Sequence, residues 1–176
     1  HQKIINLLLQ ELRKLKIMII KPDYNLKNIY EITPKMLLDM GIKAIFLDLD
    51  STIMVSKSGK FTPETMAWFE TLKKDFYIAI VTNNKNPEYT KLTKKAIPFK
   101  VVECANKPNP KKVKELIRLI SVKPHEVVMV GDRPLTDILV GKFAGTKTIL
   151  VGSINNNENM PTKIVRAIER SVIRYF

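Results

Sequence analysis

The chain has 176 residues, of which 45% are hydrophobic, and it contains no low-complexity tract. This length and composition exclude a globally disordered protein and predict one domain with a substantial core. Thirty Lys and Arg against seventeen Asp and Glu give a formal net charge of +13, which favours an anionic partner, either a lipid surface or a nucleic acid. The single cysteine, Cys104, excludes an intrachain disulfide and indicates a reducing compartment.

Residues 1–21 form an apolar and basic segment that we expect to be helical in its first half. Charged residues such as Glu11, Arg13 and Lys14 interrupt the apolar run, which argues against a transmembrane span. Two interpretations stay open: an amphipathic segment in a membrane interface, or a helix that packs on the domain or on a partner. Residues 22–176 are predicted to form the single domain.

A short apolar run at residues 44–47 predicts a buried strand, and Asp48 and Asp50 follow it. Open α/β sheets bind their ligands at the carboxyl ends of the strands. Two carboxylates at such a position can divide their roles, one attacking as a nucleophile beside a metal ion and the other exchanging a proton. The alternative for an isolated pair of this kind is a helix-capping turn.

The rest of the chain alternates short apolar runs with helical stretches. The expected strands lie at residues 77–81, 99–103, 127–130 and 148–151. The expected helices lie at residues 62–74, 89–95, 110–120 and 136–144. This alternation predicts a Rossmann-like α/β fold, with a mostly parallel five-stranded sheet and helices on both faces.

Polar residues that suit a phosphate group follow two of these strands. Thr82 and Asn83 come after the strand at 77–81 and offer a hydroxyl and an amide. Lys107 follows the strand at 99–103 and offers a compact positive charge. Taken singly, the threonine reads as a cap and the lysine as solvated surface.

Two carboxylates follow the strand at 127–130. Asp132 comes after Gly131, which permits a close approach of the backbone, and Asp137 lies five residues beyond Asp132. Such a pair suits a hard divalent cation such as Mg²⁺, while the alternative for Asp132 alone is a helix cap. All these residues in this order predict a phosphoryl-transfer site.

The same residues, in the same order, resemble the four motifs of the haloacid dehalogenase superfamily, which are DxDxT, a Ser or Thr, a Lys and an acidic pair. The resemblance covers residues 43 to about 154. It implies that Asp48 is the nucleophile and a metal ligand. It also implies that Asp50 is the general acid/base, with its backbone carbonyl on the metal.

The resemblance further implies that Thr82 and Lys107 hold the transferring phosphoryl group, and we place Asn83 beside them. Asp132 is then the principal carboxylate ligand of Mg²⁺, and Asp137 supports the ion directly or through water. Hydrolysis would proceed through an aspartyl phosphate.

The sequence around the motifs, at residues 33–43, 130–141 and 166–170, resembles the YqeG-type branch of this superfamily. That branch is similar to the phosphatidylglycerophosphate phosphatases of mitochondria, plastids and some bacteria. The resemblance implies a cytoplasmic enzyme of phospholipid metabolism, peripheral to the inner face of the membrane, or a matrix or plastid enzyme in a eukaryote. Ser51, where Asn or Glu is common, and Lys142, where Asn is usual, depart from the pattern.

The chain leaves no room for a large cap domain. Residues 51–81 hold only a short flap and one helix, and residues 85–106 hold less. An open site suits a phosphate presented on something large, because pockets normally bury most of a small ligand. The substrate classes that stay open are a membrane lipid, a protein and a polynucleotide, with anionic phospholipid favoured.

A binding module of a different class is the remaining alternative, in which a basic nucleic-acid or ribosome-associated protein keeps this fold. The catalytic residues favour an enzyme, since binding alone needs none of them in this arrangement, and no RNA motif is recognisable. The C-terminal stretch 163–174 has apolar residues at helical spacing, and its basic residues face either a membrane or solvent.

Overall fold

The apolar runs of the sequence become the strands of one parallel sheet. The computed structural model describes residues 5–6, 10–11, 20–56 and 58–154. The strands are β1 (Tyr24–Asn25), β2 (Ala44–Leu47), β3 (Tyr77–Val81), β4 (Lys100–Val102), β5 (Val127–Gly131) and β6 (Lys147–Leu150). Their order in the sheet is β1-β6-β5-β2-β3-β4, and every neighbouring pair is parallel. The predicted fold class is confirmed.

The sheet has one strand more than predicted, the two-residue edge strand β1. Its position is held by Asp23, whose carboxylate accepts hydrogen bonds from the Thr148 backbone N–H at 2.7 Å and from the Lys142 ammonium at 2.6 Å. A strand of two residues is too short to show an apolar pattern in the sequence. Its position is set instead by contacts with β6 and α6. Lys142, which departs from the branch pattern, thus has a structural contact.

The described helices are α2 (Pro34–Asp39), α3 (Pro63–Leu72), α4 (Pro87–Ala96), α5 (Lys111–Leu119) and α6 (Leu139–Ala144). Short 3₁₀ turns lie at Ile29–Glu31 and Pro124–Glu126, and a π-helical turn, Pro134–Ile138, leads into α6. Three helices start in the same way: Thr33, Thr62 and Asn86 each accept a hydrogen bond from a first-turn N–H, and proline follows each of them. Helix α2 is too short for the period-based prediction to detect.

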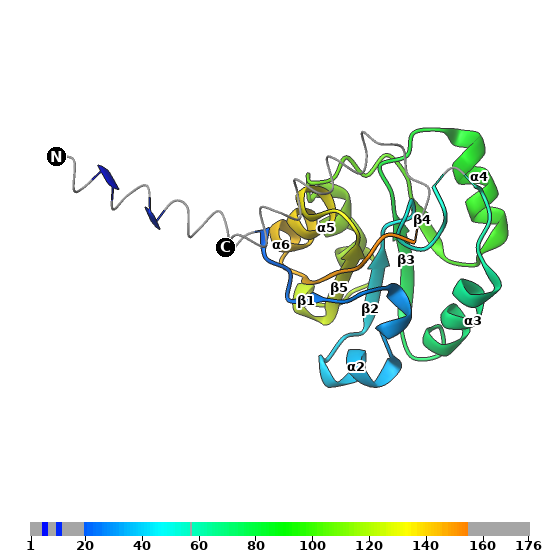
Figure 1. Ribbon diagram of the computed structural model, residues 1–176, viewed down its shortest axis with the longest axis horizontal. Coiled ribbons are helices and arrows are strands. Elements are labelled where there is room, and N and C mark those ends of the chain that lie inside the picture. Colours follow the sequence, from blue (N-terminus) through cyan, green and yellow to red (C-terminus); the bar gives the residue numbers. More distant parts are fainter. Residues whose placement is uncertain (1–4, 7–9, 12–19, 57, 155–176) are drawn as a thin grey trace.

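Two apolar layers cover the sheet, in agreement with the prediction. On one face Ile45 and Leu47 of β2 pack with Phe69 of α3 and with residues from α2. On the other face the alternating residues Ala44 and Phe46 pack with α5 and α6. Figure 1 shows α5 and α6 on one side of the strands, and α3 and α4 on the other.

The central strands end level with one another. Leu47 of β2 pairs with Ile80 of β3 and with Val130 of β5. The residues that follow these three strands therefore meet at one edge of the sheet, where the predicted site residues lie. The segment between β2 and α3, residues 51–62, is the flap, and Phe61 anchors it by an edge-on contact with Phe69, with ring centroids 5.9 Å apart.

The predictions for residues 1–21 and 163–174 fall wholly or mostly outside the described residues, and so does a test of the boundary at residue 22. Within the described part of the chain, no helix has the length and apolar character needed to traverse a bilayer.

Candidate active site

The first carboxylate after β2, Asp48, lies at the centre of the site and is 8% exposed. Its Oδ1 accepts a hydrogen bond from the Lys107 ammonium at 2.5 Å, and the Thr52 hydroxyl lies 3.3 Å from its Oδ2. Burial, opposed by the attraction of Lys107 and assisted by the nearby charges of Asp137 and Asp50, raises the pKa of Asp48 to about 6. Asp48 is thus ionised above about pH 6 in the metal-free protein.

Lys107 connects two carboxylates that come from different strands. Its ammonium donates to Asp48 and also to Asp137 Oδ1 at 2.7 Å, and the side chain is almost completely buried. Burial by itself would lower the pKa of Lys107, but the attraction of Asp137 and Asp48 outweighs it and raises the pKa. The lysine therefore remains a fixed positive charge beside the predicted nucleophile.

The backbone of Lys107 is held in place by Asn83. The Lys107 N–H donates to Asn83 Oδ1 at 2.7 Å, and Asn83 Nδ2 donates to the Lys107 carbonyl at 3.0 Å. Both ends of the Asn83 amide are thus directed at the loop that carries the lysine. This contact makes Asn83 a residue that positions Lys107, while its predicted contact with phosphate stays a prediction.

Thr82 lies at the end of β3, where it is buried. Its backbone N–H donates to the Val102 carbonyl at 3.0 Å, which fixes the residue beside β4. Its hydroxyl oxygen accepts a hydrogen bond from the Asn84 N–H at 3.0 Å, so the hydroxyl proton is available to an acceptor such as a phosphate oxygen. The role of Thr82 in phosphate binding likewise stays a prediction.

Asp132 and Asp137 complete a cluster of acidic groups around Asp48. One carboxylate oxygen of each of the three residues lies within 4.8 Å of the others, and all three side chains are buried. The Thr52 hydroxyl lies 3.2 Å from Asp132 Oδ1, so it links the loops after β2 and β5. The π-helical turn carries Asp137, whose Oδ2 accepts from the Arg133 backbone N–H at 3.0 Å.

The chemistry of this donor set fits a divalent cation. Carboxylate oxygens are the ligands that Mg²⁺ prefers, and three buried carboxylates so close together repel one another unless positive charge lies among them. Lys107 supplies one such charge, which leaves an excess of negative charge for a metal ion. The predicted metal-binding residues Asp48, Asp132 and Asp137 are therefore brought together at one point.

Asp50 belongs to the same edge but faces helix α4. Its Oδ1 accepts a hydrogen bond from the Tyr89 hydroxyl at 2.6 Å, and Asn84 Nδ2 lies 3.4 Å from its Oδ2. Asp50 also pairs with Met54 in an isolated parallel bridge, which connects it to the flap. The predicted acid/base is thus fixed from two sides.

The comparisons with known proteins agree with this geometry. A family profile described as mitochondrial PGP phosphatase matches residues 6–154. The chain belongs to this family. "Probable phosphatase YqeG" of Bacillus subtilis is 32% identical over 152 residues, which is 86% of this chain and 88% of that protein. The resemblance to YqeG-type phosphatases of the haloacid dehalogenase superfamily is confirmed, and the chain is a phosphatase of this type.

Two other similarities of this PGP phosphatase family member are more limited. The glyceraldehyde 3-phosphate phosphatase of Pyrococcus furiosus is 32% identical over 87 residues, which is 44% of this chain and 36% of that protein. The crystal structure of an uncharacterized protein from Listeria monocytogenes serotype 4b matches with a TM-score of 0.55 at 15% identity, covering 76% of this chain and 99% of that chain. The second similarity shows the fold alone.

Two residues that contact the acidic groups in this family member were not predicted as site residues, namely Thr52 and Tyr89. Thr52 is the threonine of the DxDxT motif, so the motif itself offered the signal. Tyr89 lies in the first turn of α4, directly after β3, and the first turn of a crossover helix lies at the carboxyl edge of the sheet. That position was the available signal for Tyr89.

Proposed function

We propose that the protein is a Mg²⁺-dependent phosphomonoester hydrolase that converts phosphatidylglycerophosphate to phosphatidylglycerol at a membrane surface. The observation that carries the proposal is the contact of the buried Lys107 ammonium with Asp48 at 2.5 Å, inside a cluster of three carboxylates. This arrangement joins a nucleophile, a fixed positive charge and a set of metal ligands at one point. The family match favours the phospholipid as substrate.

In the first step the ionised Asp48 attacks the phosphorus atom, and the bond from phosphorus to the glycerol oxygen breaks. The electron pair of that bond stays on the glycerol oxygen, and Asp50 gives it a proton. The result is an aspartyl phosphate on Asp48 and a free hydroxyl on the lipid. Lys107 and the Thr82 hydroxyl stabilise the negative charge that spreads over the phosphoryl oxygens.

In the second step Asp50, now ionised, takes a proton from water, and the water oxygen attacks the phosphorus atom. The bond to Asp48 breaks, so inorganic phosphate leaves and both aspartates return to their starting states. The Tyr89 hydroxyl, at 2.6 Å from Asp50, holds the carboxylate in place for both proton transfers.

Asp48, Asp132, Asp137 and the backbone carbonyl of Asp50 would hold the metal ion. When bound, Mg²⁺ would supply positive charge beside the phosphoryl oxygens and keep Asp48 ionised. The donor chemistry of the three carboxylates supports this part of the proposal.

The openness of the site supports a large substrate. In the described part of the chain, the segment from Ser51 to Phe76 holds only the flap and α3, and the segment from Asn83 to Phe99 holds only α4. A small metabolite would remain in contact with water here, whereas a lipid headgroup is presented by its own bilayer.

The test is Mg²⁺-dependent phosphate release from phosphatidylglycerophosphate in anionic vesicles, compared with release from a phosphoprotein and from a phosphorylated oligonucleotide. The control is Asp48→Asn, which removes the nucleophile with almost no change in volume. We expect selective release from the lipid, no turnover by the variant, and an unchanged circular dichroism spectrum.

Three outcomes would contradict parts of the proposal. Turnover by Asp48→Asn rules out the aspartyl phosphate. Preference for the phosphoprotein or the oligonucleotide replaces the substrate and keeps the mechanism. Absence of turnover on every substrate favours a binding module on the same fold.

A further inference from the structure

Helix α4 buries its two threonines and exposes its leucine. Thr90 and Thr93 are buried, and their hydroxyls donate to backbone carbonyls one turn back in the helix. Leu92 lies between them in sequence and is 54% exposed. Leu92 therefore does not contribute to the described core. An aliphatic side chain in this exposed position could instead contact a binding partner.

Leu92 lies against the flap. A Cβ atom built on Gly59 would be 3.5 Å from Leu92 Cδ1, which is van der Waals contact. In the same flap Val55 is 42% exposed, directly after Met54, the residue that pairs with Asp50. Leu92 and Val55 are thus exposed aliphatic side chains on two elements that both contact Asp50, α4 through Tyr89 and the flap through Met54.

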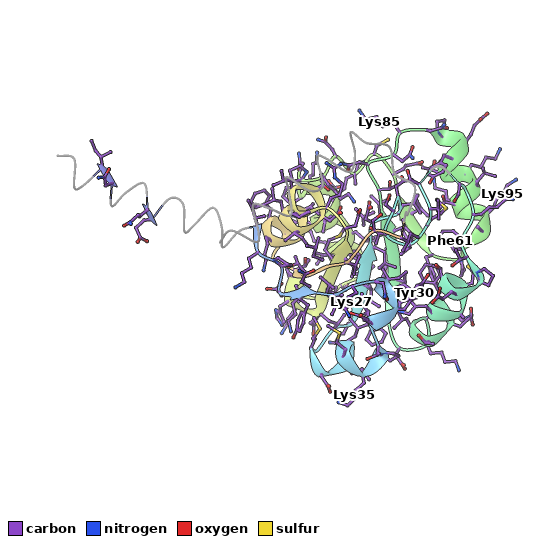
Figure 2. The ribbon with its side chains drawn as sticks, in the orientation of Figure 1. Lys27, Tyr30, Lys35, Phe61, Lys85 and Lys95 are labelled. Atoms are coloured by element: carbon purple, nitrogen blue, oxygen red, sulfur yellow. The ribbon has the colours of Figure 1, made fainter. Side chains whose placement is uncertain are left out.

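Exposed lysines lie on or next to the same two elements. Lys85 lies two residues before α4, Lys91 lies within α4, and Lys60 belongs to the flap. None of the three forms an ion pair with another described residue, whereas Lys94 on the same helix is paired with Glu103 at 2.7 Å. Figure 2 shows Lys85 and Lys95 pointing outward around α4. Residues 85–95 contain four lysines and one acidic residue, and residues 51–62 contain no acidic residue.

We propose that this surface, formed by Val55, Lys60, Lys85, Lys91 and Leu92 and called the α4–flap surface below, docks on an anionic lipid bilayer. Its charge complements anionic headgroups, and its aliphatic side chains enter the region between headgroups and acyl chains. A polynucleotide would match the lysines and would leave Leu92 and Val55 in water. The exposed pair Leu92 and Val55 therefore favours a bilayer over a polynucleotide as the partner.

This inference rests on the proposed function and adds the orientation of the enzyme. Tyr89, one helical turn before Leu92, contacts Asp50. Docking by α4 and the flap therefore brings the predicted acid/base to the bilayer surface, where the lipid phosphate lies. The predicted interfacial role of residues 1–21 is a separate contact and is not needed for this one.

The test measures sedimentation of the full chain with vesicles of phosphatidylcholine containing phosphatidylglycerol, and with vesicles of phosphatidylcholine alone. The variants are Leu92→Ser and the double variant Lys85→Gln/Lys91→Gln. The matched controls are Leu119→Ser, at a leucine of α5 that is 71% exposed, and Lys111→Gln/Lys114→Gln on the same helix. Helix α5 covers the opposite face of the sheet.

We expect binding to the anionic vesicles to weaken about fivefold for each lysine removed and about fivefold for Leu92→Ser, with the controls like wild type. Turnover of a soluble aryl phosphate should stay unchanged in all four variants, because none of the altered residues contacts the catalytic groups. Binding of a single-stranded oligonucleotide is measured in parallel.

The inference is overturned if the variants bind anionic vesicles as wild type does, if the control on α5 loses as much binding, or if the substitutions weaken only oligonucleotide binding. Failure of the proposed substrate looks different. In that case wild type binds anionic vesicles through the α4–flap surface and cleaves the soluble ester, but it releases no phosphate from phosphatidylglycerophosphate.

Discussion

Asp48 is a buried carboxylate whose ionised form is costly in the metal-free protein. Its pKa in the folded chain, about 6, lies above the ordinary value of 3.8, because burial outweighs the attraction of Lys107. The folded state therefore holds this proton more tightly than the unfolded state does. The contribution of Asp48 to the free energy of unfolding is most favourable below about pH 3.8 and is lost as the pH rises through about 6.

Activity should show the opposite dependence on pH, because only the ionised Asp48 attacks phosphorus. At low Mg²⁺ concentration we expect kcat/KM on a soluble aryl phosphate to fall as the pH drops through about 6. Saturating Mg²⁺ should move this inflection to lower pH, since a bound cation favours the ionised form. The measurement is a pair of pH profiles at two metal concentrations. If the inflection lies at the same pH at both metal concentrations, the group that titrates is not Asp48.

Tyr89→Phe should affect the proton-transfer step more than the nucleophilic attack. Loss of the 2.6 Å hydrogen bond to Asp50 leaves the acid/base less well positioned. We expect kcat/KM on an alkyl phosphate, which reports the first step alone, to fall about tenfold. On an aryl phosphate with a good leaving group, which departs without a proton, kcat/KM should change little, while hydrolysis of the aspartyl phosphate should slow equally for both substrates.

The matched control is Tyr30→Phe, which removes a hydroxyl contact of 3.1 Å to Thr65, away from the acidic cluster. Tyr30→Phe should lower the stability of the fold and leave turnover unchanged. Equal losses of kcat/KM on alkyl and aryl substrates in Tyr89→Phe would show that Tyr89 supports the fold and does not position Asp50.

At the residue scale, the sequence predicted which residues form the acidic cluster and that Lys107 lies with them. Short apolar runs mark the strands, and the residues just after each run lie at the carboxyl edge of the sheet. It did not predict that both ends of the Asn83 amide contact the Lys107 backbone, or that Tyr89 contacts Asp50. These contacts depend on loop dihedrals and on the rotation of α4 about its axis. Neither quantity leaves a periodic signal in the sequence.

The close approach between the end of β5 and the π-helical turn that carries Asp137 depends on Gly131. A Cβ atom at this position would lie 2.3 Å from Asp137 Cγ, well inside van der Waals contact. Gly131→Ala should therefore displace Asp137 and break its contact with Lys107. We expect turnover to fall at least about tenfold, as for loss of a charged hydrogen bond at a site.

Gly41→Ala is the comparison for this element. Gly41 has a φ of +70° and no heavy atom within 4 Å of the added Cβ, so the substitution should cost about 1 kcal/mol of stability through its backbone alone and keep activity. Thermal unfolding and turnover are measured on both variants. A fully active Gly131→Ala would show that the position of Asp137 is not critical.

The longer strands and helices were predicted from the sequence, whereas the two-residue strand β1 and the six-residue helix α2 were not. Strands β2 to β6 and helices α3 to α5 lie within a few residues of their expected bounds. The helix expected at 136–144 begins instead at Pro134 with the π-helical turn, which carries Asp137. The wider turn has no counterpart in a 3.6-residue pattern, so only the structure reveals it.

At the scale of the whole molecule, the acidic cluster links metal binding to stability. Mg²⁺ should raise the unfolding temperature, because an ion that binds only the folded state stabilises it by mass action, by about 2.7 kcal/mol at one hundred times its Kd. Asp132→Asn should remove this rise and should leave the metal-free protein as stable as wild type or more so, because one buried negative charge is gone.

Differential scanning fluorimetry with Mg²⁺ and with a chelator checks this prediction, and Ca²⁺ serves as a second cation. An unfolding temperature that does not respond to Mg²⁺ in wild type would contradict the assignment of Asp48, Asp132 and Asp137 as a metal site.

The exterior and the interior of the molecule differ in the sign of their charge. The chain as a whole carries +13, yet at the reaction centre three carboxylates, those of Asp48, Asp132 and Asp137, lie close together, and the Lys107 ammonium contacts two of them. A phosphate monoester would be attracted to the protein from a distance and repelled by these carboxylates over the last few ångströms. If the site binds Mg²⁺ as proposed, the cation would therefore have to enter before the phosphate.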